Sequence, residues 1–310
     1  MAKTTKNTSM LLEYIAETDR GTPASSGSLQ RPSDAVTNVN LTGTNNGEVI
    51  YTIGDYDGQD TVYGLKEYTL SFEYDIQRTE NSGTPFVNTL AKSIQYYALT
   101  RSSGLLTPLT FYVHTNSTTT YECRGCVIDS WSMNVTPGGR LHCTVNVSVA
   151  SVACRTGQYT SLDSSTAWGN TFETFQGASI TRTGGFDEGV GGFTVTINNN
   201  PSGAPNIGKQ VYVNYYEGLQ NLSGTVDVLL NSGGKTDWEE MTGSAGSGAP
   251  TEQSIVFNSG TSTTAGDKSM KWTFANAAYT NMPINFSAED GYVVSGVTWT
   301  AESVTLEEYS

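Results

Sequence analysis

The sequence predicts a mainly β protein made of two tandem β-sandwich or barrel domains, each with one flanking α-helix. Three observations lead to this prediction. Apolar and polar residues alternate over long stretches, which is the spacing of half-buried strands. Gly, Asn, Asp and Pro interrupt these stretches at short intervals, as turns do. The same order of elements recurs about 150 residues later, which indicates an internal repeat.

Length and composition exclude several classes of protein. The chain has 310 residues, of which 36% are apolar, so it can bury a substantial core. Asp and Glu outnumber Lys and Arg by 30 to 16, giving a net charge of −14. Tight binding of nucleic acid is therefore not expected, because it requires a basic surface. No apolar run is long enough to span a membrane, and Glu13 interrupts the only apolar patch near the N-terminus, so we expect no membrane contact and synthesis in the cytoplasm.

Three parts are expected along the chain. Residues 1–45 are rich in Thr, Ser, Asn and Gly and are interpreted as an N-terminal arm. Residues 46–165 form the first β domain and residues 166–310 the second. The segment 163–191 is rich in Ser, Thr and Gly, so we place the boundary there.

The clearest strand of the first domain covers residues 66–77. Its two faces differ in polarity, as in an antiparallel strand with one face on the core and the other exposed to solvent. The apolar face carries Tyr68, Leu70, Phe72, Tyr74 and Ile76, and the polar face carries Glu67, Thr69, Ser71, Glu73 and Asp75. Further strands are expected at residues 109–114, 121–135 and 140–152, with a turn at 136–139.

One helix is expected in each domain. In the first, Thr84 is the predicted cap and Pro85 the first helical residue, and the helix should end near Leu99. Its apolar residues recur every four positions, at Phe86, Leu90, Ile94 and Ala98. In the second, Thr236 and Glu239 have the spacing of a capping box and predict a shorter helix.

Corresponding residues of the two halves keep the same order and the same face. The pair Gly64-Leu65 opens the strand described above, and Gly218-Leu219 opens its counterpart. On the apolar face of this strand, Leu222, Val226, Val228 and Leu230 align with Tyr68, Phe72, Tyr74 and Ile76. On its polar face, Asp227 aligns with Glu73. Later in the two halves, Ile284–Ser287 aligns with Met133–Thr136, and Val297 and Trp299 align with Val145 and Val147. Agreement in order, face and turn position favours a duplication.

Catalytic and metal-binding patterns are missing. The histidines, His114 and His142, lie at alternating positions of predicted strands without a nucleophile motif. The acidic turn from Asp55 to Asp60 imitates half a calcium loop, but Lys66 stands where a bidentate Glu is required. We therefore predict that the protein is not an enzyme and holds no cofactor or metal.

The four cysteines leave three alternatives open. The first interpretation is that Cys123, Cys126, Cys143 and Cys154 are buried thiols, because four cysteines could form too few disulfides to stabilise so long a chain. A disulfide between Cys123 and Cys154 is the second alternative. Zinc held by the four thiolates is the third, although the spacing of the last two is unlike a zinc knuckle.

The Tyr and Trp residues could form a stacking platform for sugars, as in a tandem β-sandwich adhesin or carbohydrate-binding protein. Most of them, including Tyr68, Tyr74, Trp131 and Trp299, fall on the faces that also carry Leu and Val. We therefore expect them in the core.

Five segments of the second half carry a resemblance to a known family. They are Phe193-Thr-Val-Thr-Ile-Asn-Asn-Asn, Gly218-Leu-Gln-Asn-Leu-Ser-Gly-Thr-Val-Asp-Val, Lys271-Trp-Thr-Phe, Met282-Pro-Ile-Asn-Phe and Asp290-Gly-Tyr. In order and style they resemble the tail tube (major tail) proteins of tailed phages and tailed archaeal viruses. The resemblance covers residue 46 to the C-terminus, and the Thr22-Pro23 segment is similar to the N-terminal segment that precedes the tube domain in this family.

The resemblance implies a structural protein of the virion tail. In such proteins β-sandwiches surround a channel, inner sheets join between subunits, and rings stack through loops and arms into a conduit for genome ejection. It implies as partners other copies of the chain, the tail terminator and baseplate proteins, and viral DNA in transit without tight binding. With two domains per chain, three chains would complete a ring of six, whereas a hexamer would apply if only one half lined the channel. A tail hub or baseplate protein is a further alternative.

A DNA conduit should not retain its cargo, and carboxylates and hydroxyls repel or release phosphate. The candidates for the lumen surface are Glu67, Glu73, Asp75, Asp227 and Glu302. Closure of sheets between subunits would also remove the unpaired edges that an isolated sandwich exposes.

Overall fold

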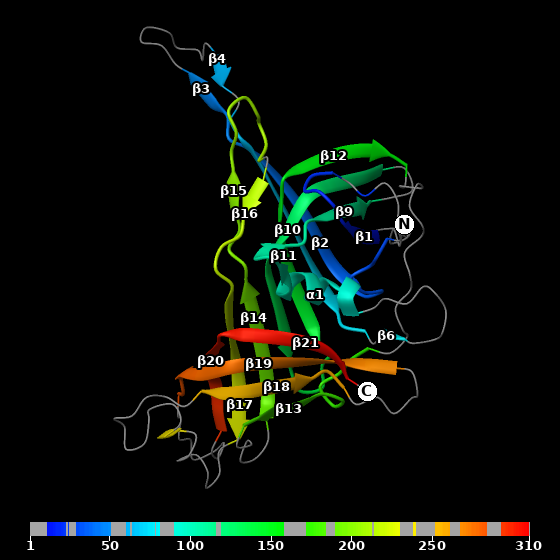
Figure 1. Ribbon diagram of the computed structural model, residues 1–310. Coiled ribbons are helices and arrows are strands. Elements are labelled where there is room, and N and C mark those ends of the chain that lie inside the picture. Colours follow the sequence, from blue (N-terminus) through cyan, green and yellow to red (C-terminus); the bar gives the residue numbers. More distant parts are fainter. Residues whose placement is uncertain are drawn as a thin grey trace, which may run out of the picture.

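The computed structural model describes residues 11–22, 24, 29–50, 60–62, 64–77, 79–80, 90–115, 119–157, 172–183, 190–212, 214–229, 238–239, 252–260, 267–283 and 293–309. Within these ranges the protein is mainly β, and most strands belong to one large antiparallel sheet (Figure 1). The predicted β class is therefore confirmed. Among the described residues, no helix has the length and apolar character needed to cross a membrane.

The described elements follow one another along the chain as β1 (Leu11–Ala16), β2 (Val36–Asn45), β3 (Glu48–Ile50), β4 (Asp60–Val62), β5 (Lys66–Asp75), β6 (Thr79–Glu80), the 3-10 helix η1 (Leu90–Lys92), α1 (Ile94–Leu99), β7 (Arg101–Ser102), β8 (Leu105–Leu106), β9 (Leu109–His114), β10 (Thr119–Val135), β11 (His142–Val149), β12 (Ser151–Thr156), β13 (Ser179–Arg182), β14 (Val190–Asn198), β15 (Ser202–Ala204), β16 (Asn214–Tyr216), β17 (Asn221–Leu229), β18 (Gln253–Asn258), β19 (Asp267–Asn281), β20 (Val293–Ala301) and β21 (Ser303–Tyr309).

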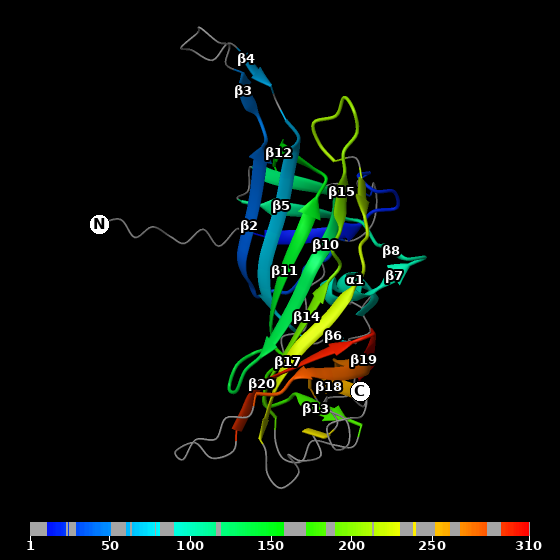
Figure 2. The same ribbon diagram turned by 90° about the vertical axis from the view of Figure 1, so that its left-hand side faces the viewer.

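Strand order is the same in the two halves. In the first half, one layer runs β2-β5-β11-β10 and another runs β1-β9-β10-β12, with the long strand β10 shared. In the second half, the layers run β14-β17-β20-β19 and β13-β18-β19-β21, with β19 shared. The halves join where β10 pairs with β14, so that β2, β5, β11, β10, β14 and β17 lie side by side (Figure 2).

The two long strands bend at matching places. The β10–β9 register breaks between Cys123 and Cys126, and the β19–β18 register breaks between Phe274 and Ala277. An extra residue in one strand increases its local twist and turns its two ends toward different partners. Each long strand can therefore serve both layers of its half.

The core fills the space between the layers and is continuous across the two halves. Trp131 of β10 and Trp272 of β19 are fully buried and stack with ring centroids 6.4 Å apart. Tyr74 and Trp299 are buried as well, and Tyr68 packs against the same cluster. The prediction that these aromatic residues form core is confirmed.

The first helix begins later than predicted. The expected start at Thr84 lies outside the described residues, but Ser93 has an extended conformation and interrupts any helix that began there. The Ser93 hydroxyl accepts a hydrogen bond from the Tyr96 N–H, so Ser93 is the N-cap and α1 starts at Ile94. The predicted end at Leu99 is confirmed. In the second half only Trp238 and Glu239 of the expected helix are described, and both are helical.

The predicted strand at residues 140–152 is wrong in its extent. Two strands replace it, because the chain bends at Ala150 and β11 and β12 pair with opposite ends of β10. The strands expected at 109–114 and 121–135 are present as β9 and β10. Part of the predicted arm also joins the sheets, as β1 and β2.

Candidate lumen surface and assembly edges

One face of the sheet from β2 to β19 points away from the core and carries mostly hydroxyls and amides. The strand registers align its side chains in rows across the sheet. One row consists of Asn38, Glu73, Thr144, Ser132, Thr196, Ser223 and Thr300, and the next consists of Asp75, His142, Asn134, Thr194, Thr225, Thr298 and Asn281. The Thr194 and Thr225 hydroxyls bond at 2.7 Å, and Asn146 Nδ2 donates to Ser130 Oγ at 2.9 Å. Neighbouring side chains on this face therefore form hydrogen bonds with one another, and most of them remain partly exposed to solvent.

The free edge of β2 differs from the matching edge of β14. Both strands present apolar side chains to the core at corresponding positions, namely Val39 and Leu41 on β2 and Phe193 and Val195 on β14. Phe193 and Val195 are buried, whereas Val39 and Leu41 are only partly buried. The difference arises because β10 pairs with β14, while β2 pairs only with β5 among the described strands. An unpaired edge of this kind is ready to pair with another chain.

Two hairpins extend beyond this sheet at the same end, β3–β4 from the first half and β15–β16 from the second (Figure 2). At the base of each hairpin, two backbone segments approach too closely for a side chain to fit between them. A Cβ added at Gly64 would lie 1.6 Å from the Asn46 carbonyl oxygen, and one at Gly218 would lie 2.4 Å from that of Asn200. Only glycine permits such a close approach of two backbone segments. Beyond its base, the second hairpin turns around Ile207, whose side chain is fully exposed.

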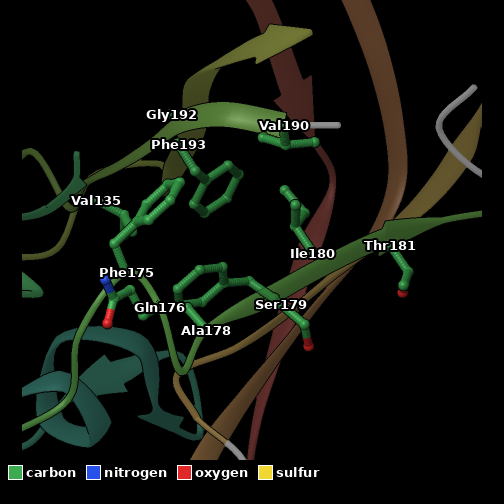
Figure 3. A pocket seen from close by; sticks show the side chains of 11 residues that line it. Val135, Phe175, Gln176, Ala178, Ser179, Ile180, Thr181, Val190, Gly192 and Phe193 are labelled. Atoms are coloured by element: carbon green, nitrogen blue, oxygen red, sulfur yellow. The ribbon is translucent and has the colours of Figure 1, made fainter. Parts of the chain in front are cut away.

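An apolar pocket of about 580 Å³ lies between β13 and β14. Figure 3 shows Phe175, Ile180, Val190 and Phe193 around a common space. Val135, Ala178 and Phe257 complete the apolar part of its lining. The pocket is thus an opening between the two layers of the second half.

The model of the phage tail tube protein family matches residues 10–301. The chain belongs to the phage tail tube protein family. It is a structural component of a virion tail and assembles with its own copies into a tube, and the resemblance seen in the sequence is confirmed. A comparison with curated proteins finds no match.

Four of the five predicted lumen carboxylates of this tail tube protein lie on the polar face of the sheet. Glu67 accepts a hydrogen bond from the Tyr212 hydroxyl at 2.7 Å, and Asp227 accepts one from the Gly296 N–H at 2.6 Å. Glu73 lies on β5 beside His142. Glu302 lies apart, at the bend between β20 and β21, where Asn276 Nδ2 donates to it at 2.7 Å.

Asp75, the remaining carboxylate, is largely buried and already paired. Its oxygens lie 2.9 Å from His142 Nδ1 and 3.2 Å from Arg140 Nη1. Opposite charge within such distances offsets the field of a carboxylate. Asp75 therefore contributes less negative charge to this surface than Glu67 or Glu73.

The cysteines of the tail tube protein are free thiols. Cys123, Cys126 and Cys143 are buried as predicted, but Cys154 is exposed on β12, so the first interpretation of all four as buried thiols is wrong for Cys154. Burial raises the pKa of Cys123 to about 12 and raises the pKa values of Cys126 and Cys143 as well. Cys123 opposes Val152 across the β10–β12 pair, whereas Cys154 opposes Tyr121. Cys123 and Cys154 are thus diagonal neighbours that are not bonded to each other in the structure, and the alternative of a disulfide between them stays a prediction.

Both histidines take part in hydrogen bonds between strands. His114 is buried, with Nε2 3.2 Å from Glu13 and Nδ1 2.8 Å from the Thr120 hydroxyl, so it links β9 to β1 and β10. Among the described residues no group of three or more His, Cys, Asp or Glu side chains could hold a metal. The acidic turn at residues 55–59 lies outside the described residues.

Sequence reasoning missed the exposed hairpin tip and the pocket. A signal for the tip was present, since Pro205, Asn206 and Gly208 surround a single aliphatic residue. Turn residues that enclose an isolated Ile predict an exposed side chain. No comparable signal existed for the pocket, because residues 175–181 and 190–193 meet only in the folded chain.

Proposed function

We propose that three chains form a ring of six tube domains and that rings stack into the conduit for genome ejection. The domains are residues 46–165 and 166–310, preceded by an arm of residues 1–45 whose strand β2 completes the first sheet. The tail terminator and baseplate proteins would bind the two ends of the tube. A conduit role follows from the family, and the trimer follows from the internal repeat.

The shared strand register supports two equivalent domains. Phe72 opposes Val145 on one side and Val39 on the other. Val226, which lies 154 positions after Phe72, opposes Val297 and Phe193 in the same way. The hairpin strands β3 and β4 are separated from β15 and β16 by the same number of positions. Corresponding residues of β2, β3, β4 and β5 are thus all separated by 154 positions from those of β14, β15, β16 and β17. One constant separation is expected if one ancestral unit was copied.

The single observation that carries the trimer is the β10–β14 pair. It joins the first domain to the second, edge to edge, within one chain. The counterpart of β10 is β19, and the counterpart of β14 is β2. If the chain from Asn281, the last residue of β19, onward pairs with β2 of the next chain, every domain joins its neighbour alike, and six domains require three chains.

The polar face is then the lumen surface. Its Ser, Thr and Asn side chains offer phosphates only weak hydrogen bonds that water replaces easily, and Glu67, Glu73 and Asp227 add repulsion. The lining is therefore mainly neutral, with acidic points, and DNA can slide past it.

A matched pair of disulfides tests this proposal. The Asn199 N–H donates to the Asp129 carbonyl at 2.7 Å, which makes Ser130 and Asn198 a non-hydrogen-bonded cross-strand pair. Such Cα atoms lie about 4.5 Å apart, within disulfide range. The offsets of the repeat make Asn281 and Thr44 the corresponding pair between chains.

In a Cys154→Ser background, Ser130→Cys with Asn198→Cys should form a disulfide within one chain. Asn281→Cys with Thr44→Cys should instead form one between chains and give a covalent trimer in the assembled protein. If the second pair stays reduced in tubes while the first oxidises, β19 and β2 do not meet as proposed.

A further inference from the structure

The pocket between β13 and β14 is lined mainly by apolar side chains, and an exposed aliphatic side chain elsewhere in the molecule has the matching chemistry. We propose that rings stack by insertion of Ile207, at the tip of the β15–β16 hairpin, into this pocket of a chain in the next ring. This inference rests on the proposed ring assembly and names the residues of the contact between rings.

The hairpin tip is built to present Ile207. The Lys209 N–H donates to the Asn206 carbonyl at 3.1 Å, which closes a β-turn with Ile207 and Gly208 at its centre. Gly208 has φ +81°, which such a turn readily accommodates at glycine. Ile207 is fully exposed, and its neighbours from Pro205 to Gln210 are polar or turn-forming. A single aliphatic side chain fixed on a turn and left in water has no role in the stability of the isolated chain.

The pocket supplies the complementary surface. Phe175, Ile180 and Val190 line it and remain only partly buried in the chain. Phe193 forms its inner wall, stacked on Phe257 with centroids 5.0 Å apart. Apolar side chains that stay exposed around a preformed concavity mark a binding site for an apolar group.

The two features lie at opposite ends of the same strand pair. Val190 and Gly192, at the start of β14, line the pocket, whereas β14 leads at its other end into β15 and the tip (Figures 1 and 2). The extended chain from Gly192 to Ile207 spans about 50 Å. A knob at one end and a socket at the other cannot meet within one copy. When Ile207 (the knob) of each copy enters the pocket (the socket) of the next copy, the head-to-tail contacts do not form a closed ring. They therefore build a linear stack of copies, as a tube requires.

Substitution at the tip tests the contact without risk to folding, because Ile207 touches no core. Ile207→Asp should leave rings intact and raise the protein concentration needed for tube formation at least about ten-fold. Asn206→Asp adds the same charge at the same tip, and Ile207→Leu keeps the apolar group, so both should assemble as the parent chain does. Tube length by electron microscopy and ring mass by light scattering are the readouts.

Each outcome decides something different. Normal tubes from Ile207→Asp would overturn the knob-and-socket contact while the proposed ring stands. Loss of rings as well as tubes would also overturn it, because the contact would then not be axial. A parent chain that forms neither rings nor tubes would instead contradict the proposed function itself.

A cross-link tests the socket directly. Gln176 is exposed at the pocket rim. In a Cys154→Ser background, Asn206→Cys and Gln176→Cys on separate chains, mixed and assembled, should form a mixed disulfide. Asn206→Cys mixed with Thr196→Cys, on the polar face, should not. Tubes without the first cross-link, or with both, would contradict the assignment.

Discussion

Gly125 and Asn276 occupy the same place in the two long strands and share a left-handed backbone, with φ +61° and +51°. Gly125 comes two residues after Cys123, which opposes Phe111. Asn276 likewise comes two residues after Phe274, which opposes Ile255. The register breaks beside both residues. The bend that lets β10 and β19 serve two layers therefore depends on a conformation that few residues adopt easily, and Gly and Asn are the usual ones.

Alanine at these two positions should destabilise the fold unequally. Gly125→Ala places a Cβ 2.8 Å from the Ala150 Cβ in a left-handed conformation and should cost about 2–4 kcal/mol of unfolding free energy. Asn276→Ala should cost about 1 kcal/mol, because it loses an exposed hydrogen bond to Glu302 and adds backbone strain. Denaturant titration of both variants measures the difference. Equal costs would mean that the clash at Ala150 relaxes freely.

The buried carboxylate Glu122 should contribute far more to stability than an exposed one. It is fully buried and accepts hydrogen bonds from Arg124 Nη2 at 2.8 Å and Arg155 Nε at 2.5 Å. Glu122→Gln should lower the unfolding free energy by about 2 kcal/mol, because two partly exposed guanidinium groups keep a hydrogen-bond acceptor but lose its negative charge. Glu307→Gln, which breaks the exposed pair with Lys271, should change it by less than about 1 kcal/mol. A similar change in both variants would contradict this reading of Glu122.

Thiol chemistry should separate Cys154 from the other cysteines. At pH 8 an aromatic disulfide reagent should modify one thiol quickly in the folded protein and four after denaturation, since only Cys154 is exposed. The raised pKa of Cys123 means that the folded state holds its proton while the unfolded state, with an ordinary value near 9.0, loses it. This contribution to stability is complete below about pH 9 and is lost between about pH 9 and 12. Fast modification of two or more thiols in the native protein would count against the burial.

If the polar face lines the channel, as proposed, it should not retain DNA. Tubes of the parent chain should show no tight binding of duplex DNA at 0.15 M salt, measured by co-sedimentation. Ser132→Lys, Thr196→Lys and Ser223→Lys, combined on one row of the polar face, should create salt-dependent binding if this face lines the channel. Retention of DNA by parent tubes would contradict a conduit that releases its cargo.

The sequence predicted what depends on local periodicity. The alternation along β5 identified its core face and polar face, and the turn at residues 136–139 separated β10 from β11. Periodicity could not reveal that the chain bends at Ala150, because both sides of the bend alternate alike. It also could not show that Ser93 caps α1, since the apolar spacing runs on through that residue.

The candidate site was predicted only in part for a similar reason. Side chains on one face of a strand are visible in the sequence, so four carboxylates were placed on the polar face. The pairing of Asp75 with Arg140 and His142 depends on strands that are distant in sequence. The same is true of the free edge of β2, because an edge is defined by the strands that do not pair with it.

The central claim is that each chain supplies two equivalent wall segments, and the symmetry of an assembled ring tests it most directly. Averaged cross-sections of tubes by electron cryo-microscopy, with the ring mass, should give three chains of 33.2 kDa around six similar lobes. Six chains per ring, or a ring in which one half of each chain points outward, would contradict the account.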